Sequence, residues 1–551
     1  MTICRKYEFF FLAVFLNSSF AFSQILDKIT AGEIHGNFQT DVQYYNEDTI
    51  IGAAAVPEKM LMNGFSNIIY SNKSFSAGIR YESYLNALQG FPEGYRGNGI
   101  PYRFATFSNE KLTITVGNYY DQFGSGLIFR SYEERGLGYD NAMDGIRISY
   151  QIYKGVNIKG IVGKQRRYFD YGEGIVRGAD LELNVNEIFD SLANAKTRVI
   201  LGGSFVSKYQ IDQNSQYNLP ENVGAFAGRL NVIRGRFNLY GEYAYKINDP
   251  SADNGYIYKP GEGLLLQGSY SQRGLGISLA VKRIDNMSFR SDRDAALMEL
   301  QINYLPAFTR QHTYNLLATL YPYATQPNGE MAFQGELIYK LKKGSPLGGK
   351  YGTGILINYS MANNIDTILL NDETNDRMGY KSDFLKFGDD VYFRDFNVEI
   401  SKKFNKKLKG IFTYANVAYN KDVIEGKVDY GIVYADLGVA DITYKIAKKH
   451  AIRGEIQGLF TDQDQGDWAT VILEYTRSPH WFFAVMDQYN YGNPKAEKRV
   501  HYYYASFGYT RNASRIMLSY GRQRAGIFCV GGVCRNVPAS NGITLTVTST
   551  F

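Results

Sequence analysis

The 551-residue sequence has no long apolar run after its first residues. Beyond Gln24 there is no stretch of about 18 uninterrupted apolar residues, the length that a membrane-spanning helix needs. Helical membrane spans are therefore excluded from residues 24–551. The mean hydropathy of −0.29 nevertheless suits a spanning barrel, whose strands alternate apolar and polar residues.

Several other features are scarce. There are 13 prolines and 2 tryptophans, and no linker rich in Pro, Ser or Gly divides the chain, so we expect one domain over residues 24–551. The net charge of +6 is small for this length and gives no case for a nucleic-acid partner. The five histidines are scattered without metal-ligand or triad spacing, so we expect no metal, no cofactor and no enzyme activity.

Aromatic residues and glycine are abundant, with 46 Tyr, 34 Phe and 56 Gly. Segments such as 112–116, 145–152 and 275–282 alternate in a two-residue period, and no long helical stripe competes with them. We count about 26 such segments, with 24 as the alternative. The pattern predicts an all-β, antiparallel up-and-down transmembrane barrel, with aromatic residues at the membrane interfaces.

Short polar turns alternate with long linkers, which include 46–59, 127–143, 285–295 and 525–541. With an even number of strands and long first and last connections, both termini are expected in the periplasm. Only about ten residues precede the first strand, which leaves no room for an N-terminal plug domain. So wide a barrel must be narrowed by inward loops, lumen side chains or another protein.

The two ends of the sequence carry address signals. Arg5 and Lys6 precede the apolar run 9–16, and a small-residue cleavage site follows at 21–23, so residues 1–23 are predicted to be a secretory signal peptide. The last ten residues alternate threonines with an apolar face and end on an aromatic residue. This ending resembles the closing strand of bacterial outer-membrane barrels, which the barrel-insertion machinery reads. The apolar face, expected to meet outer-membrane lipid, is Ile543, Leu545, Val547 and Phe551.

The region around 127–143 is dense in charges of both signs. Folded inward, it would form a constriction whose field sorts solutes. The structural alternative is that the charges pair with one another and fill the lumen wall. The candidate residues are Asp121, Arg130, Glu133, Glu134, Arg135 and Arg147.

The same region carries a resemblance. Phe123-Gly-Ser-Gly-Leu127, followed by Asp144-Gly-Ile-Arg147, is similar to the pattern of alginate-export and other porin-like barrels. In that pattern a glycine-containing strand precedes the turn and an Arg-Gln pair follows its glycine, whereas here Asn118-Tyr119 follows Gly117. Segments 122–130 and 526–538 resemble more closely a Bacteroidota family of outer-membrane barrels of unknown function, which implies the fold but no activity.

After removal of the leader only two cysteines remain, Cys529 and Cys534. In an exported protein so close a pair predicts a disulfide that staples the last external loop. Metal binding is the rival hypothesis, but two thiols without a nearby histidine make a poor zinc site.

Three functions remain open. The first is a porin-like channel for small polar solutes. The second is a non-conducting structural or assembly component that docks other envelope proteins or lipoproteins. The third is an outer-membrane hydrolase, which would need a Ser or Asp–His pair on one external face.

Overall fold

The computed structural model describes residues 32–295, 297–371, 376–530 and 533–551. The main sheet has 24 strands. In chain order they are β1 (Glu33–Asn46), β2 (Met60–Asn72), β3 (Phe75–Leu85), β4 (Gly97–Ser108), β5 (Leu112–Tyr119), β8 (Met143–Tyr153), β9 (Val156–Arg167), β10 (Asp170–Asn184), β11 (Thr197–Tyr209), β12 (Asn222–Arg234), β13 (Phe237–Lys246), β14 (Gly261–Gln272), β15 (Leu275–Asp285), β16 (Gly329–Leu341), β17 (Thr353–Leu369), β18 (Tyr380–Lys403), β19 (Leu408–Asn420), β20 (Ile432–Ala447), β21 (His450–Phe460), β22 (Trp468–Arg477), β23 (Trp481–Tyr489), β24 (His501–Arg511), β25 (Ser514–Gln523) and β28 (Ser540–Thr550).

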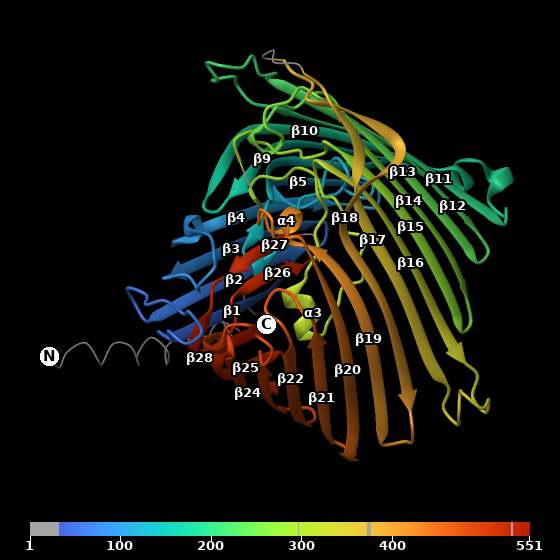
Figure 1. The fold of residues 1–551 in the computed structure, drawn as a ribbon. Coiled ribbons are helices and arrows are strands. Elements are labelled where there is room, and N and C mark those ends of the chain that lie inside the picture. The colour runs from blue at the N-terminus through green and yellow to red at the C-terminus, as the bar shows by residue number, and fades with distance from the viewer. Residues whose placement is uncertain (1–31, 296, 372–375, 531–532) are drawn as a thin grey trace.

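The sheet closes into an antiparallel barrel, because β1 pairs with β2 on one side and with the last strand, β28, on the other (Figure 1). Each remaining strand pairs with the barrel strands before and after it in the chain. This is the predicted up-and-down transmembrane barrel. The predicted signal peptide, residues 1–23, lies outside the described residues.

The strand count corrects the first expectation of 26 and agrees with the alternative of 24. The expected connection after β15 ended at residue 295, but in the structure β16 begins only at Gly329. The additional length, which would have held another hairpin, lies inside the barrel. Its apolar residues are buried against the inner wall and do not form membrane-facing strands.

Two further β pairs and the described helices belong to the connections. The pairs are β6 (Glu133–Glu134) with β7 (Tyr139–Asp140), and β26 (Gly526–Val530) with β27 (Val533–Val537). The α-helices are α2 (Val185–Ile188), α3 (Asn315–Leu320) and α4 (Lys421–Ile424), and the 3₁₀ helices include η2 (Arg135–Leu137). Among the described helices, none has the length and apolar character that a bilayer crossing requires.

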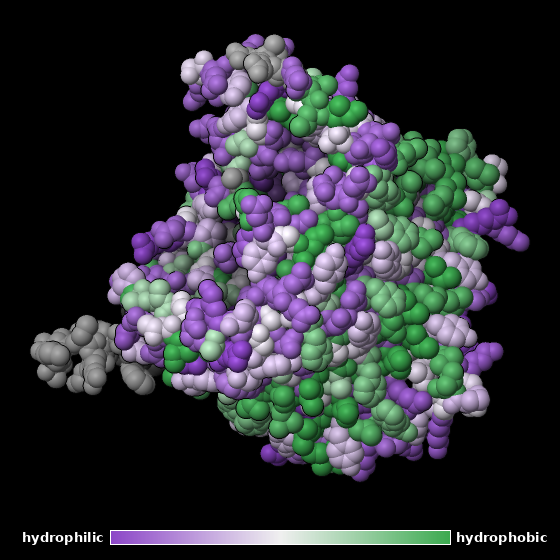
Figure 2. All heavy atoms as spheres, in the orientation of Figure 1, coloured by the Kyte–Doolittle hydropathy of each residue, from purple (hydrophilic) through white to green (hydrophobic). Residues whose placement is uncertain are grey.

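The outer face of the barrel is apolar. On β13, for example, Phe237 and Leu239 are exposed on the outside, as are Tyr243 and Tyr245. Figure 2 shows the resulting green surface over the strands, with hydrophilic residues gathered toward the ends. The terminal strand follows the same rule: Ile543, Leu545 and Phe551 are exposed and Val547 is partly exposed, whereas Thr546 donates a hydrogen bond to Asp41 (2.6 Å).

The inner face changes along each strand. We call the two ends of the barrel the short-turn rim, where β12 joins β13, and the long-loop rim, where β13 joins β14. The inward residues of β13 run from exposed Asn238 and partly exposed Tyr240 to buried Glu242, Ala244 and Lys246. The half of the lumen at the short-turn rim is therefore open to water, and we call it the vestibule. The other half is filled.

Candidate functional site: the filled half of the lumen

Two long connections fill the lumen near the long-loop rim. Inner loop 1 is residues 120–142, between β5 and β8, and inner loop 2 is residues 286–295 and 297–328, between β15 and β16. Backbone hydrogen bonds join them: Arg130 N donates to Ile302 O and Tyr304 N to Gly126 O, both at 2.9 Å. Within inner loop 2, Ile302 N donates to Phe289 O (2.8 Å). The two loops thus satisfy each other's backbone groups, as buried segments must.

Buried amide side chains strengthen this junction. Asn303 donates from Nδ2 to the carbonyls of Leu127 (3.1 Å) and Met287 (2.7 Å). Asn141 Nδ2 and Gln165 Nε2 both donate to the carbonyl of Gln301, at 2.8 and 2.6 Å. Since Gln165 belongs to β9, the last of these bonds also fixes inner loop 2 to the barrel wall.

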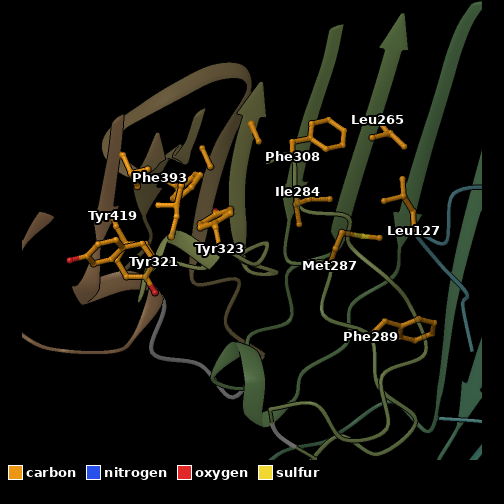
Figure 3. Close-up of a cluster of buried hydrophobic side chains, with 14 of the residues drawn as sticks. Leu127, Leu265, Ile284, Met287, Phe289, Phe308, Tyr321, Tyr323, Phe393 and Tyr419 are labelled. Atoms are coloured by element: carbon orange, nitrogen blue, oxygen red, sulfur yellow. The ribbon is translucent and has the colours of Figure 1, made fainter. Parts of the chain in front are cut away.

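Apolar and aromatic side chains pack the loops against the wall. In Figure 3, Tyr321 and Tyr323 of inner loop 2 lie beside Tyr419 of β19 and Phe393 of β18. The ring centroids are 5.3 Å apart for Tyr321–Tyr419 and 4.8 Å for Tyr323–Phe393. On the other side of the same view, Leu127 and Met287 lie near Leu265 and Ile284 of the wall, and Phe289 lies farther along inner loop 2. This contact removes apolar surface from water and stabilises the filled half of the lumen.

A buried ionic cluster holds inner loop 1 to strands β3 and β9. Arg166 of β9 bonds Glu82 of β3 through two contacts (2.9 and 2.6 Å) and Asp140 of the loop at 2.6 Å. Arg80 of β3 contacts the same two carboxylates, at 2.7 Å to Glu82. All four side chains are at most 4 % exposed. Buried charges are tolerated only when paired in this way.

A second group of ion pairs lies beside inner loop 2. Asp249, in the connection after β13, forms ion pairs with Lys208 at 2.7 Å and with Lys246 at 3.4 Å. Lys246 also donates to the carbonyl of Ser288 in the loop. Burial alone raises the pKa of Asp249, but the two ammonium groups outweigh it and the pKa lies below its usual value. Lys282 and Glu330 form another fully buried pair, at 2.7 Å.

The candidate constriction residues from the sequence all lie in this region but do not form one ring. Asp121 pairs with Arg147 (2.5 Å) and with Lys159 (2.8 Å). Glu133 pairs with Arg135 (2.7 Å) and with Arg80 (3.0 Å). The remaining two, Arg130 and Glu134, are held differently.

Arg130 makes aromatic contacts: its guanidinium carbon lies 4.3 Å from the ring centroid of Tyr132 and 4.1 Å from that of Tyr304. Glu134 pairs through its backbone with Tyr139 in the β6–β7 ladder. The sequence did not identify the strand partners Arg80, Glu82 and Arg166, because alternation alone does not show which inward charges meet. One signal was available in β19, whose inward Ala415, Val417 and Tyr419 are apolar where a water-filled lumen would favour polar residues.

A third connection, after β25, also contacts the filled half. Arg524 Nη2 donates to the carbonyl oxygen (2.9 Å) and to the hydroxyl oxygen (2.8 Å) of Thr319 in α3. Helix α3 also packs against β26. Figure 1 shows β26 and β27 drawn within the ring of strands. The backbone register sets Cys529 opposite Cys534. Their side chains lie outside the described residues, so the disulfide stays a prediction.

These features define a class: a transmembrane β-barrel whose lumen is open at one rim and filled by its own connections at the other. A family model matches residues 6–551, and the chain belongs to that family, a family of unknown function (DUF6029). No curated protein matches the chain.

Three similar solved structures are barrels of other kinds. The P pilus usher (PapC) translocation pore is 9 % identical, with a TM-score of 0.43, over 94 % of this chain and 99 % of that one. The ferric enterobactin receptor PfeA of Pseudomonas aeruginosa is 10 % identical, with a TM-score of 0.41, over 94 % and 80 %. OccAB3 of Acinetobacter baumannii is 9 % identical, with a TM-score of 0.35, over 95 % and 100 %. At this level of similarity no function is transferred.

Proposed function

We propose that the protein is an outer-membrane channel for small polar solutes, whose passage is restricted by inner loops 1 and 2. The observation that carries the proposal is the vestibule. On β13, inward Asn238 is exposed and inward Ala244 is buried, so a water-filled lumen ends at the loops and not at a wall of the barrel. Besides their apolar packing, the loops are held by hydrogen bonds and ion pairs, which can be exchanged for others when the loops move.

Location and orientation belong to the same proposal. The apolar outer face and the terminal strand support an outer-membrane site, and the leader predicted at residues 1–23 supports export. We place the short-turn rim, with both termini, in the periplasm. The vestibule then faces the periplasm, and inner loops 1 and 2 lie toward the exterior. The partners are outer-membrane lipid and the insertion machinery.

The test is conductance in planar bilayers. The wild-type barrel should give small single-channel conductance steps. A variant in which residues 288–326 are replaced by a four-residue Gly-Ser linker should give conductance steps several-fold larger. A matched control shortens the exposed segment 494–499, whose hydrogen bonds lie within residues 493–499 and not with the inner loops. Silent bilayers for all three proteins, each shown to be folded, would contradict a channel.

A second candidate function, docking of another envelope protein, is supported by the β17–β18 hairpin. β17 and β18 extend past the ends of their pairing with β16 and β19 (Figure 1). The extension exposes Ile368, Leu369 and Leu385 by 70, 80 and 78 %. Exposed apolar groups of this kind are typical of interaction sites.

Docking predicts co-purification of a partner under mild detergent, lost in the Leu369→Ser/Leu385→Ser double variant. The Val428→Ser variant, on a different external connection, is the control. The contact of His312 in inner loop 2 with Asp395 of β18 does not support a hydrolase: the two side chains are 2.7 Å apart inside the lumen, whereas the hypothesis required an external face.

A further inference from the structure

A groove of about 740 Å³ crosses the outer wall over β2, β3, β4, β5 and β8. Its sides are the outward isoleucines and valine of four strands, each 43–53 % exposed. Its floor is formed by alanine and glycine residues. The side residues are Ile68, Ile79, Val116 and Ile146. The floor residues include Ala77, Ala105, Gly117 and Gly145.

One floor position of the groove is restricted to glycine. A side chain at Gly117 would place its Cβ 2.4 Å from the carbonyl oxygen of Arg103, and φ at this position is +94°. Only glycine fits such a position without strain. The groove therefore has no side chain at this position, and its floor there is backbone.

One end of the groove is charged. Arg103 Nη1 contacts Asp144 Oδ2 (3.1 Å), Asn118 Oδ1 (3.2 Å) and the Tyr171 hydroxyl (2.9 Å). The Arg103 side chain is 51 % exposed, and Nε and Nη2 have no hydrogen-bond partner among the described residues. Lys164, which is exposed, stands opposite Asp144 in the β8–β9 register. Two cations thus face one carboxylate.

The charged end lies at the boundary of the apolar surface. Asp144 is the second residue of β8, at the long-loop end, and the outward residues that follow it are Ile146, Ile148, Tyr150 and Ile152. A charge at this height of a membrane barrel meets lipid headgroups, and the apolar residues below it meet acyl chains.

We propose that this groove binds a phosphate-bearing lipid of the leaflet around the long-loop rim. The phosphate accepts hydrogen bonds from Arg103, with Lys164 adding positive charge, and an acyl chain lies in the groove. Guanidinium groups bind phosphate through two parallel N–H bonds, and Arg103 has Nε and Nη2 for that purpose. The occupant is a lipid because the groove opens on the face that the bilayer covers. The site requires a membrane-embedded barrel but does not require that the barrel conduct.

Native mass spectrometry of the intact barrel in detergent tests the site, with dioleoyl phosphatidic acid as the probe and dioleoylglycerol as the lipid of equal chains without phosphate. Wild type should bind one phosphatidic acid at least tenfold more tightly than diacylglycerol. Arg103→Ala should remove this preference. Ala105→Trp, which fills the floor without changing charge, should weaken binding of both lipids tenfold or more.

Two further variants sharpen the result. Asp144→Asn frees Arg103 from its carboxylate and should tighten phosphatidic acid binding several-fold. Arg177→Ala removes another exposed arginine, which does not line the groove and donates a hydrogen bond of 2.8 Å to Asn222. This variant should leave binding within twofold of wild type. Wild-type binding by both Arg103→Ala and Ala105→Trp would overturn the proposal, as would an equal loss in Arg177→Ala. Gel heat-modifiability establishes that each variant is folded.

Discussion

Arg166 and Glu82 are joined by two hydrogen bonds of 2.9 and 2.6 Å, although their strands are not neighbours in the sheet. β4, β5 and β8 lie between β3 and β9. The pair therefore spans the inner side of the wall at the rim where β5 ends and β8 begins, which is where inner loop 1 leaves and rejoins the wall. Asp140 of that loop bonds the same guanidinium, so one arginine couples two distant strands to the loop.

Breaking this pair should destabilise the barrel. Glu82→Gln leaves Arg166 buried and partly uncompensated, and loss of one partner of a buried ion pair costs about 3–5 kcal/mol. We expect a lower unfolding temperature in detergent, followed by circular dichroism, and faster amide exchange in residues 120–142. Glu58→Gln, at an exposed rim position that bonds Asn86, is the matched control. Equal unfolding temperatures of the two variants would show that the ionic cluster does not stabilise the barrel.

Arg130 should act as a clamp between the inner loops. Its planar group lies against Tyr132 of inner loop 1 and Tyr304 of inner loop 2, and each contact contributes about 0.5–1 kcal/mol. Arg130→Ala should raise both the mean conductance and the frequency of large openings. Arg135 is 34 % exposed, pairs with Glu133 of its own loop and lies over the Phe65 ring of β2 at 3.6 Å, so its contacts are not with inner loop 2 and Arg135→Ala should change both less. The reverse order of effects would contradict the clamp.

Acid should loosen inner loop 2 only at low pH. The pKa of Asp249 lies below its ordinary value. The carboxylate therefore stabilises the folded loop fully above the unfolded-state pKa, about 3.9, and this stabilisation is lost as pH falls through the folded-state pKa. Conductance should therefore be constant between about pH 5 and 8 and rise below about pH 4. In Asp249→Asn, which cannot titrate, the loop should already be loose at pH 7. A wild-type transition near neutral pH would contradict this account.

The two cysteines should be oxidised in the exported protein. Cys529 and Cys534 are opposite each other in the β26–β27 register, which is the placement that a staple across a hairpin requires. Intact mass after alkylation should show no modification without reductant and two modifications after reduction. Alkylation of both thiols without reductant would support free cysteines, and a zinc-dependent block of alkylation would favour the metal hypothesis.

The wall of the barrel could be predicted from the sequence, and the filling of the lumen could not. Alternation in segments such as 275–282 is a local property, and it places the strands and their outer faces. The contact between Asn303 and Leu127 joins positions 176 residues apart, and nothing local records it. Leu316 and Leu320 of α3 are apolar whether they face lipid or the lumen, so the sequence could not show that this stretch turns inward. The composition of inner loop 1 predicts a charged site, but its partners on β3 and β9 are set only by the closure of the barrel.

Thiol labelling along β13 tests the filled lumen most directly. In a background with Cys529 and Cys534 changed to serine, Asn238→Cys and Ala244→Cys place single thiols on the same inward face, one in the vestibule and one beneath the inner loops. With a membrane-impermeant maleimide in detergent-free nanodiscs, Asn238→Cys should label rapidly and Ala244→Cys at least tenfold more slowly, and replacing residues 288–326 by the short linker should remove the difference. Equal labelling of the two thiols in the full-length protein would contradict a lumen closed by its own loops.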